Sequence, residues 1–340
     1  MIGIGVIGYG YWGPNFVRNI SELADARVVI VADLKGERLA LAKRRNPVIE
    51  TTRDPLDVIN HPQVDAVIVA TPVATHFDLA LQAVRAGKHT LVEKPVCATR
   101  SQAERLIEAA DSRNVTLMVD HTFLYTGAVR KVKELVGSGQ IGDVYYYDAV
   151  RINLGLFQSD TNVLWDLAVH DLSIIDFVLG VQPTALSCSG VSHVPGQRED
   201  VAFLTLHFPA NLIAHLHVNW LSPVKLRRTL IGGSRRMIVY DDLEPHEKVR
   251  VHDKGVIVDD QEKRYQLRLV GYRTGDVWSP QVDLSEALRT ELIHFTHCIE
   301  GREQPITDGR SGLRVVRLLE AASQSLANKG IPIELGAAAV

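Results

Sequence analysis

The 340-residue sequence predicts an α/β domain built on a parallel sheet, followed by an α+β domain with an open, mainly antiparallel sheet. Three observations support this fold class. The chain is longer than the roughly 250–300 residues at which one hydrophobic core usually stops growing. Up to residue 120, short β-branched runs alternate with longer amphipathic segments, which is typical of repeated βαβ units. Beyond residue 140, runs with period-two alternation dominate, as in a sheet with one covered face.

The first domain is expected over residues 1–120. Its strand candidates are apolar runs with little alternation, as expected of strands that helices cover on both faces. These runs lie at 3–7, 28–32, 66–70, 89–92 and 116–119. Amphipathic segments between them predict helices at 14–23, 36–45, 76–86 and 101–113.

The second domain is expected over residues 121–340. Alternating runs and intervening turn signals predict strands at 143–152, 185–191, 201–208, 212–220, 228–231 and 237–240. Helices predicted at 165–179, 286–300 and 309–328 would cover one face of this sheet.

Composition excludes several classes of protein. With 37 Lys and Arg against 40 Asp and Glu, the formal net charge of −3 provides no field that would hold a polyanion, which argues against nucleic-acid and membrane-surface proteins. Cys97, Cys188 and Cys298 are far apart in the chain and predict neither a disulfide framework nor a thiolate metal site. Because there is also no signal-peptide pattern and no apolar run of about 18 residues, we expect a cytoplasmic protein that does not span a membrane.

A glycine-rich motif leaves the first predicted strand and opens the first predicted helix. It consists of Gly8, Tyr9, Gly10, Tyr11, Trp12 and Gly13, the GxGxxG of dinucleotide-binding turns. Asp33 follows 20 residues after the last glycine, where a carboxylate accepts hydrogen bonds from an adenosine ribose and repels a 2′-phosphate. The motif therefore predicts NAD rather than NADP. The alternatives are FAD and a glycine-rich turn without a ligand.

Two further motifs lie at the ends of predicted strands: Glu93-Lys94-Pro95, and Ala70-Thr71-Pro72 with His76. They resemble motifs of the Gfo/Idh/MocA family of nicotinamide-dependent sugar and polyol oxidoreductases. The resemblance extends over essentially the whole chain and implies a Rossmann domain followed by an open sheet that serves as substrate platform and oligomer interface. It also implies that Lys94 lies beside the nicotinamide, and that Thr71, Pro72, His76 and Glu93 belong to the cofactor site.

The segment 165–171 matches the D-x-x-x-H element of that family. Asp166 and His170 are four residues apart, so on a helix they share one face. The resemblance implies that His170 is the general base, Lys94 orients the reacting hydroxyl, and Asp166 positions the substrate or the histidine. Which of His170 and Lys94 takes the proton remains open. A surface pair is the alternative, and no metal is predicted because no third ligand follows at a suitable spacing.

Closer similarity to the WlbA-like branch of the family lies in the segments 8–15, 121–125, 151–160 and 219–228. This branch oxidises the 3-hydroxyl of a UDP-N-acetylhexosamine or its uronate. The resemblance thus implies hydride transfer between this hydroxyl and NAD. The alternatives are a ketoreductase acting on a deoxysugar nucleotide, an inositol or free-sugar dehydrogenase and, in a different class, a non-catalytic NAD-binding regulator.

Five residues are candidates for substrate contacts: Tyr125, Arg151, Asn153, Arg227 and Arg228. Arg151 and Asn153 are two apart on a predicted strand and share a face. The arginines at 227 and 228 belong to a basic segment at 221–236 that contains no acidic residue and would suit a diphosphate or carboxylate. An exposed basic hairpin is the alternative for this segment. From the resemblance we expect a homodimer or homotetramer formed through the C-terminal sheet.

Overall fold

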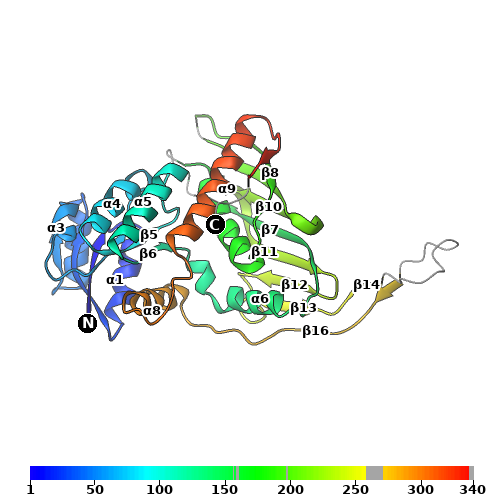
Figure 1. The fold of residues 1–340 in the computed structure, drawn as a ribbon, viewed down its shortest axis with the longest axis horizontal. Helices are drawn as coiled ribbons and strands as arrows, with labels where there is room; N and C mark the ends of the chain where they lie inside the picture. The colour runs from blue at the N-terminus through cyan, green and yellow to red at the C-terminus, as the bar shows by residue number, and fades with distance from the viewer. Residues whose placement is uncertain (156, 158–160, 197, 258–270, 337–340) are drawn as a thin grey trace. The chain divides into compact units, whose positions relative to one another are not determined.

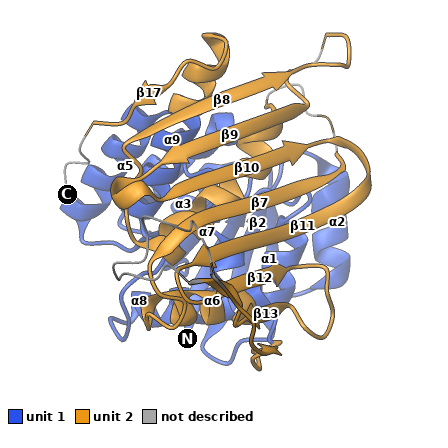
Figure 2. Ribbon diagram, turned by 90° about the vertical axis from the view of Figure 1, so that its right-hand side faces the viewer, with its two compact units in different colours: residues 1–125, 285–320 blue, residues 126–284, 321–340 orange. Residues whose placement is uncertain are grey.

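The computed structural model describes residues 1–155, 157, 161–196, 198–257 and 271–336. Part of the segment 151–160 that carries the branch resemblance, residues 156 and 158–160, therefore lies outside the described residues. The chain divides into two compact units, coloured separately in Figure 2. The first unit comprises residues 1–125 and 285–320, and the second comprises residues 126–284 and 321–340.

The first unit contains a six-stranded parallel sheet with the strand order β3-β2-β1-β4-β5-β6. Its strands are β1 (Ile2–Ile7), β2 (Ala26–Ala32), β3 (Glu50–Thr52), β4 (Ala66–Val69), β5 (His89–Glu93) and β6 (Leu117–Asp120). This order reverses direction beside β1, and ligands of doubly wound sheets bind outside the carboxyl ends of the strands at such a point. The predicted parallel sheet is confirmed, with the short polar strand β3 as an addition.

Helices cover both faces of this sheet. They are α1 (Gly13–Ser21), α2 (Gly36–Arg45), α3 (Pro55–Ile59), α4 (His76–Arg85), α5 (Arg100–Arg113), α8 (Ala287–Ile299) and the larger part of α9 (Gly309–Ala327), with 3₁₀ turns η1 (Val73–Thr75) and η2 (Thr122–Tyr125). In Figure 1, α4 lies beside α5, and α1 lies beside α8. Among the described residues, no helix has both the length and the apolar character needed to cross a bilayer.

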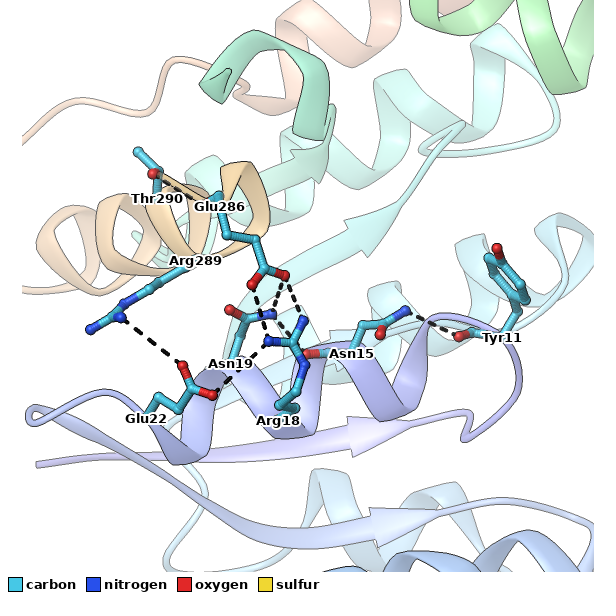
Figure 3. A network of polar contacts seen from close by, with 8 residues as sticks. All are labelled: Tyr11, Asn15, Arg18, Asn19, Glu22, Glu286, Arg289 and Thr290. Carbon is cyan, nitrogen blue, oxygen red and sulfur yellow. Dashed lines mark hydrogen bonds and ion pairs between the residues drawn. The ribbon is translucent and has the colours of Figure 1, made fainter. Parts of the chain in front are cut away.

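The contact between α1 and α8 joins segments that are far apart in the sequence (Figure 3). Arg18 donates two hydrogen bonds to Glu286, at 2.6 and 3.0 Å, and the Asn19 amide donates a third at 3.0 Å. Leu288, Leu292 and Phe295 of α8 are buried. Residues 285–320 therefore pack with the first unit. A single division at residue 120 does not reproduce this, because nothing in the local pattern of α8 indicates which sheet it covers.

The second unit contains a nine-stranded sheet with the order β16-β13-β12-β11-β7-β10-β9-β8-β17, much of which faces the viewer in Figure 2. The strands are β7 (Val144–Leu154), β8 (Ala185–Val191), β9 (Val201–His207), β10 (Ile213–Asn219), β11 (Leu221–Gly233), β12 (Met237–Asp241), β13 (Val249–His252), β16 (Val277–Trp278) and β17 (Ile333–Glu334). A separate pair consists of β14 (Gly255–Ile257) and β15 (Gly271–Arg273), and a 3₁₀ turn, η4 (Pro209–Asn211), joins β9 to β10. Of the nine-stranded sheet's pairs, only β7 with β10 is parallel, so the described sheet is mainly antiparallel, as predicted.

One face of this sheet is covered and the other is open. On β10, Ala214, Leu216 and Val218 are buried, while the residues between them are partly or fully exposed. The covering helices are α6 (Gly127–Gly137), the π-helical turn η3 (Leu164–Ala168), α7 (Val169–Leu179) and the end of α9. The predicted helix at 165–179 is present, but its first turn is a π-helix, which the sequence pattern does not reveal.

Candidate active site

The glycine-rich turn between β1 and α1 leaves room for a ligand at one glycine. A Cβ on Gly8 would lie 2.4 Å from the Ala70 carbonyl oxygen, and one on Gly13 would lie 2.2 Å from the Gly8 carbonyl oxygen. Gly8 also has a φ of +100°. These two glycines are therefore required by the fold itself. A Cβ on Gly10 would meet nothing closer than the Arg38 guanidinium at 3.5 Å, so the absence of a side chain there suits a pyrophosphate that approaches the backbone.

Asp33 lies just after β2 and is held by backbone groups. Its carboxylate accepts hydrogen bonds from the N–H groups of Tyr9 and Lys35, both at 2.8 Å. Arg38 adds a charged hydrogen bond at 3.2 Å. The carboxylate is thus fixed at the strand end where a ribose-binding acid is expected. Arg38 was not predicted, although its position two residues into α2 places it close to both Asp33 and Gly10.

The three aromatic positions of the turn differ in exposure. The side chain of Tyr9 is buried at 2% exposure, so its N–H, rather than its ring, faces the Asp33 carboxylate. Tyr11 is 79% exposed, and its ring meets that of Trp12 edge-on, with centroids 5.9 Å apart. Trp12 continues this contact to Phe16 of α1. Of the predicted cofactor residues in the turn, Tyr11 therefore has the most accessible side chain.

His76 connects the two loops that follow β4 and β5. Its ring nitrogens lie 2.7 Å from the Thr71 carbonyl oxygen and 2.9 Å from the Pro95 carbonyl oxygen. Burial lowers the pKa of His76 more than these carbonyls raise it, and the charge of Lys94 acts in the same direction as burial. A neutral imidazole has one N–H, so it donates to one of the two loops at a time. The structure places His76 among backbone carbonyls, where it orders the loops of Thr71, Pro72 and Lys94.

Acidic residues accompany Lys94 at the carboxyl ends of β5 and β6. Glu93 and Asp120 are directly paired across the two strands, and both are buried. Glu291 of α8 is completely buried and acts electrostatically on both carboxyls. Lys94 interacts electrostatically with Asp120. Neither Asp120 nor Glu291 was predicted; the sequence signal for Asp120 is an acid at the end of an apolar strand, and Glu291 has no such signal.

In the second unit, Asp166 lies in η3 and His170 in the first turn of α7. The indole N–H of Trp220 donates to the Asp166 carboxylate at 3.1 Å, and Trp220 itself is 1% exposed. The Ser173 hydroxyl donates to the His170 carbonyl at 2.7 Å. π-Helical turns inside helices are frequent at functional sites. Both residues of the predicted element are therefore present on one short, well-anchored segment.

Arg151 also anchors this segment. Its guanidinium donates to both oxygens of Asp171, at 2.7 and 3.1 Å, and both side chains are buried. Burial opposes the charged form of Arg151, but the Asp171 charge raises the pKa of Arg151 overall. Arg151, which was predicted to contact the substrate, thus makes two hydrogen bonds to Asp171, the residue that follows His170.

The remaining predicted substrate residues lie in different environments. Tyr125 belongs to the first unit, is 2% exposed, and its hydroxyl lies 3.0 Å from the Thr307 hydroxyl. The Asn153 amide donates to the Leu154 carbonyl at 3.0 Å. Arg227 pairs with Arg151 across β11 and β7 and donates to Asp242 at 3.3 Å.

Arg227 and Arg228, both candidates for substrate contacts, lie on different faces of the sheet. Adjacent strand residues point to opposite faces of a sheet. Arg227 is on the covered face with Arg151, while Arg228 is exposed on the open face. The two guanidiniums are therefore not presented to one ligand. Elsewhere in the basic segment, Arg236 pairs with Asp253 at 3.7 Å, so part of its charge is neutralised within the protein.

The structure offers no obvious metal centre in the part that it describes, where three or more His, Cys, Asp or Glu side chains nowhere gather in a suitable group. His215 and His217, which share a face of β10, stack instead on Phe203, with ring centroids 6.2 and 4.4 Å away.

Comparisons with known proteins match two stretches of the chain to models of one family. Residues 2–121 match the model of an oxidoreductase family with an NAD-binding Rossmann fold, and residues 129–239 match the GFO/IDH/MocA C-terminal domain. Myo-inositol 2-dehydrogenase of Thermotoga maritima is 25% identical, with 96% of each chain covered. The NAD(+)-dependent scyllo-inositol 2-dehydrogenase of Bacillus subtilis is 24% identical, covering 98% of this chain and 95% of the relative. Among solved structures, UDP-N-acetylglucosamine 3-dehydrogenase GnnA of Acidithiobacillus ferrooxidans has a TM-score of 0.81 at 23% identity and covers 96% of this chain and 98% of its own.

Proposed function

Because the chain belongs to the Gfo/Idh/MocA family of oxidoreductases, we propose that it is an NAD-dependent dehydrogenase of a secondary ring hydroxyl on a sugar or cyclic polyol. The observation that carries this proposal is the anchoring of segment 165–171. Trp220 fixes Asp166 and Arg151 fixes Asp171, so His170 lies between two residues that are held from distant strands. Such preorganisation of a proton-accepting group is what a dehydrogenase requires.

The proposed roles follow from the chemistry of each side chain. His170 accepts the hydroxyl proton, because a neutral imidazole is a suitable base near pH 7. Lys94 donates a hydrogen bond to the hydroxyl oxygen and orients it. Asp166, held by the Trp220 indole, positions His170 or the substrate. NAD supplies the hydride acceptor, and the open space at Gly10 together with the fixed Asp33 carboxylate suits its pyrophosphate and ribose.

The first candidate substrate is a UDP-linked N-acetyl amino sugar or its uronate, oxidised at the 3-hydroxyl. Four segments of the sequence support it by resemblance, and GnnA shares the fold. The second candidate is an inositol or free sugar. It is favoured by the names of two relatives that match nearly the whole chain, and by the separation of Arg227 and Arg228 onto opposite sheet faces.

A substrate panel tests the proposal and separates the candidates. The protein is mixed with NAD⁺ and either UDP-N-acetylglucosamine, its uronate, myo-inositol, scyllo-inositol or free glucose, and NADH absorbance is followed. We expect turnover with one of the two substrate groups and at least tenfold less with the other. NADH oxidation with a deoxysugar-nucleotide ketone would instead identify a ketoreductase. Tight NAD binding without turnover in either direction would favour a non-catalytic regulator.

A homo-oligomer formed through the open sheet face is part of the same proposal. Phe203 and Ile213 are 43% and 41% exposed there, and Ile213 has Tyr146 as its neighbour on β7. Burial of these side chains in an interface would favour association. Replacing Phe203 and Ile213 with Ser and Thr should lower the mass observed in light scattering to that of a monomer. An unchanged mass would place the interface elsewhere.

A further inference from the structure

Two buried carboxyl groups meet next to Lys94 in the first unit. Asp120 ends β6 and is 2% exposed, and Glu291 lies in α8 and is 0% exposed. Their carboxyls lie within hydrogen-bond reach of each other. Glu93 is the strand partner of Asp120, and the next residue along the chain is Lys94. The pair thus lies beside the end of β5, one residue before the proposed catalytic residue Lys94.

The hydrogen-bond donors around this pair are too few for two carboxylates. One Asp120 oxygen accepts hydrogen bonds from the N–H of Thr122, at 3.2 Å, and from its hydroxyl. Among the described residues, the other Asp120 oxygen and both Glu291 oxygens are buried and accept no hydrogen bond of standard geometry. The Thr122 hydroxyl acts on both carboxyls, but its single hydrogen is already donated to Asp120. A buried carboxylate without donors is strongly unfavourable, and two adjacent ones repel each other. A single proton between the carboxyls supplies the missing donor.

The electrostatic environment agrees with this count. Burial raises the pKa of Asp120 and raises that of Glu291 well above its usual range. Lys94 opposes the shift at Asp120, while Glu93 reinforces the shift at Glu291. Two further titratable residues lie on the same segments. They are His121, which follows Asp120, and His294, which is one turn from Glu291 and pairs with Glu303.

We propose that Asp120 and Glu291 share one proton at neutral pH, and that the negative charge left on the pair positions the Lys94 ammonium. Paired carboxyls that hold one proton between them have precedent in enzyme sites. A fixed negative charge beside the ammonium restricts where Lys94 points, and so acts through Lys94 on the substrate hydroxyl. The positioning part rests on the proposed function, whereas the shared proton does not.

The shared proton is tested by the pH dependence of unfolding. A native state that binds one proton more than the unfolded chain loses stability as pH rises above the unfolded carboxyl pKa of about 4.3, until the folded pKa is reached. Between about pH 5.5 and 7.5, the unfolding equilibrium constant of wild type relative to Glu291→Gln should rise about tenfold per pH unit. The amide that Glu291→Gln introduces is a permanent donor to Asp120, so this variant needs no proton.

A matched control and a double variant make every outcome decisive. Glu286→Gln changes an exposed acid of the same helix region and should leave the slope of the wild type in place. The double variant Asp120→Asn with Glu291→Gln should lose the slope, as the single variant does. A slope that persists in the double variant overturns the buried proton. A slope that persists in Glu291→Gln and is lost in the double variant places the proton on Asp120 alone, and a slope that persists in Asp120→Asn places it on Glu291 alone; either result overturns sharing. In infrared spectra, a protonated-carboxyl band present in wild type and absent in the double variant is expected; no such band in wild type overturns the proposal.

The positioning part is tested by kinetics with the substrate found in the panel. The double variant removes the charge of the Asp120–Glu291 pair, while Glu291→Gln keeps it on Asp120, and Glu93 is unchanged in both variants. We expect kcat to fall at least tenfold further in the double variant than in the single one, with a changed pH profile and similar affinity for NAD. Equal kcat values and equal pH profiles overturn the positioning role. If no substrate is turned over, the proposed function fails, while the unfolding measurements still decide the shared proton.

Discussion

The glycine-rich turn of the first unit and segment 165–171 of the second unit are determined in different ways. In the turn, the space around the backbone determines which residues fit: a Cβ on Gly13 would lie 2.2 Å from the carbonyl oxygen of Gly8 in the same turn. In segment 165–171, hydrogen bonds from distant strands determine where the side chains lie: Trp220 holds Asp166, and Arg151 holds Asp171. A local backbone requirement is visible in a short motif, whereas anchoring by distant residues is not. The two regions should therefore fail differently when they are altered.

The largest effect is expected when one proposed catalytic residue is removed from each unit. Lys94→Ala and His170→Ala should each lower kcat about 10²–10⁴-fold, because an orienting donor or a proton acceptor is lost. Binding of NAD, measured by fluorescence titration, should persist in His170→Ala. Near wild-type turnover in either variant, with NAD bound, would contradict the corresponding role.

The next largest effect concerns the anchor of the second unit. Arg151→Met leaves Asp171 as an unpaired buried charge and should lower the free energy of unfolding by about 3–5 kcal/mol. Adding Asp171→Leu removes that charge and should recover most of the loss. Chemical denaturation of both variants provides the measurement. If Arg151 is instead a substrate contact, Arg151→Met will raise KM while stability stays near that of the wild type.

These two regions also explain what could be predicted from the sequence. The sequence could single out the glycines, Asp33 and the β5 end as candidates, because each motif lies within a short stretch of chain and contiguous apolar runs mark the strands beside it. Which residues belong to which compact unit was harder to predict, because the amphipathic pattern of α8 indicates a buried face without indicating what that face packs against. The short strand β3 has no apolar run and gives no signal.

Side-chain roles that depend on tertiary contacts were the least predictable. Arg151 and Arg228 are both basic strand residues, and only the three-dimensional register distinguishes the buried ion pair from the exposed side chain. Glu291 reads as an ordinary helical acid, and its burial beside Asp120 follows from the packing of α8. Charge patterns in sequence therefore identify candidates, while burial assigns their roles.

A smaller effect separates two glycines of the same turn. Gly13→Ala forces backbone atoms apart and should destabilise the protein by about 1–3 kcal/mol. The Cβ added by Gly10→Ala meets no close protein atom, so the melting temperature of this variant should match that of the wild type. Its Kd for NAD should rise about tenfold, which corresponds to a loss of about 1.4 kcal/mol in binding free energy. Thermal unfolding and NAD titration of both variants distinguish the fold requirement from the ligand requirement. Unchanged NAD affinity in Gly10→Ala would remove the pyrophosphate from this position.

The smallest effect is expected at the exposed contact between α1 and α8. Hydrogen bonds from Arg18 lower the pKa of Glu286 below that of the unfolded chain. The contribution is therefore fully present above the unfolded pKa of about 4.3 and is lost as pH falls through the folded pKa. Because both side chains are nearly half exposed, Glu286→Gln should cost only about 0.2–1 kcal/mol at pH 7, and this cost should shrink as pH falls through the folded pKa of Glu286. This sign is opposite to that expected for Glu291→Gln, so a comparison of the two variants across pH separates an exposed ion pair on α8 from a buried proton on the same helix.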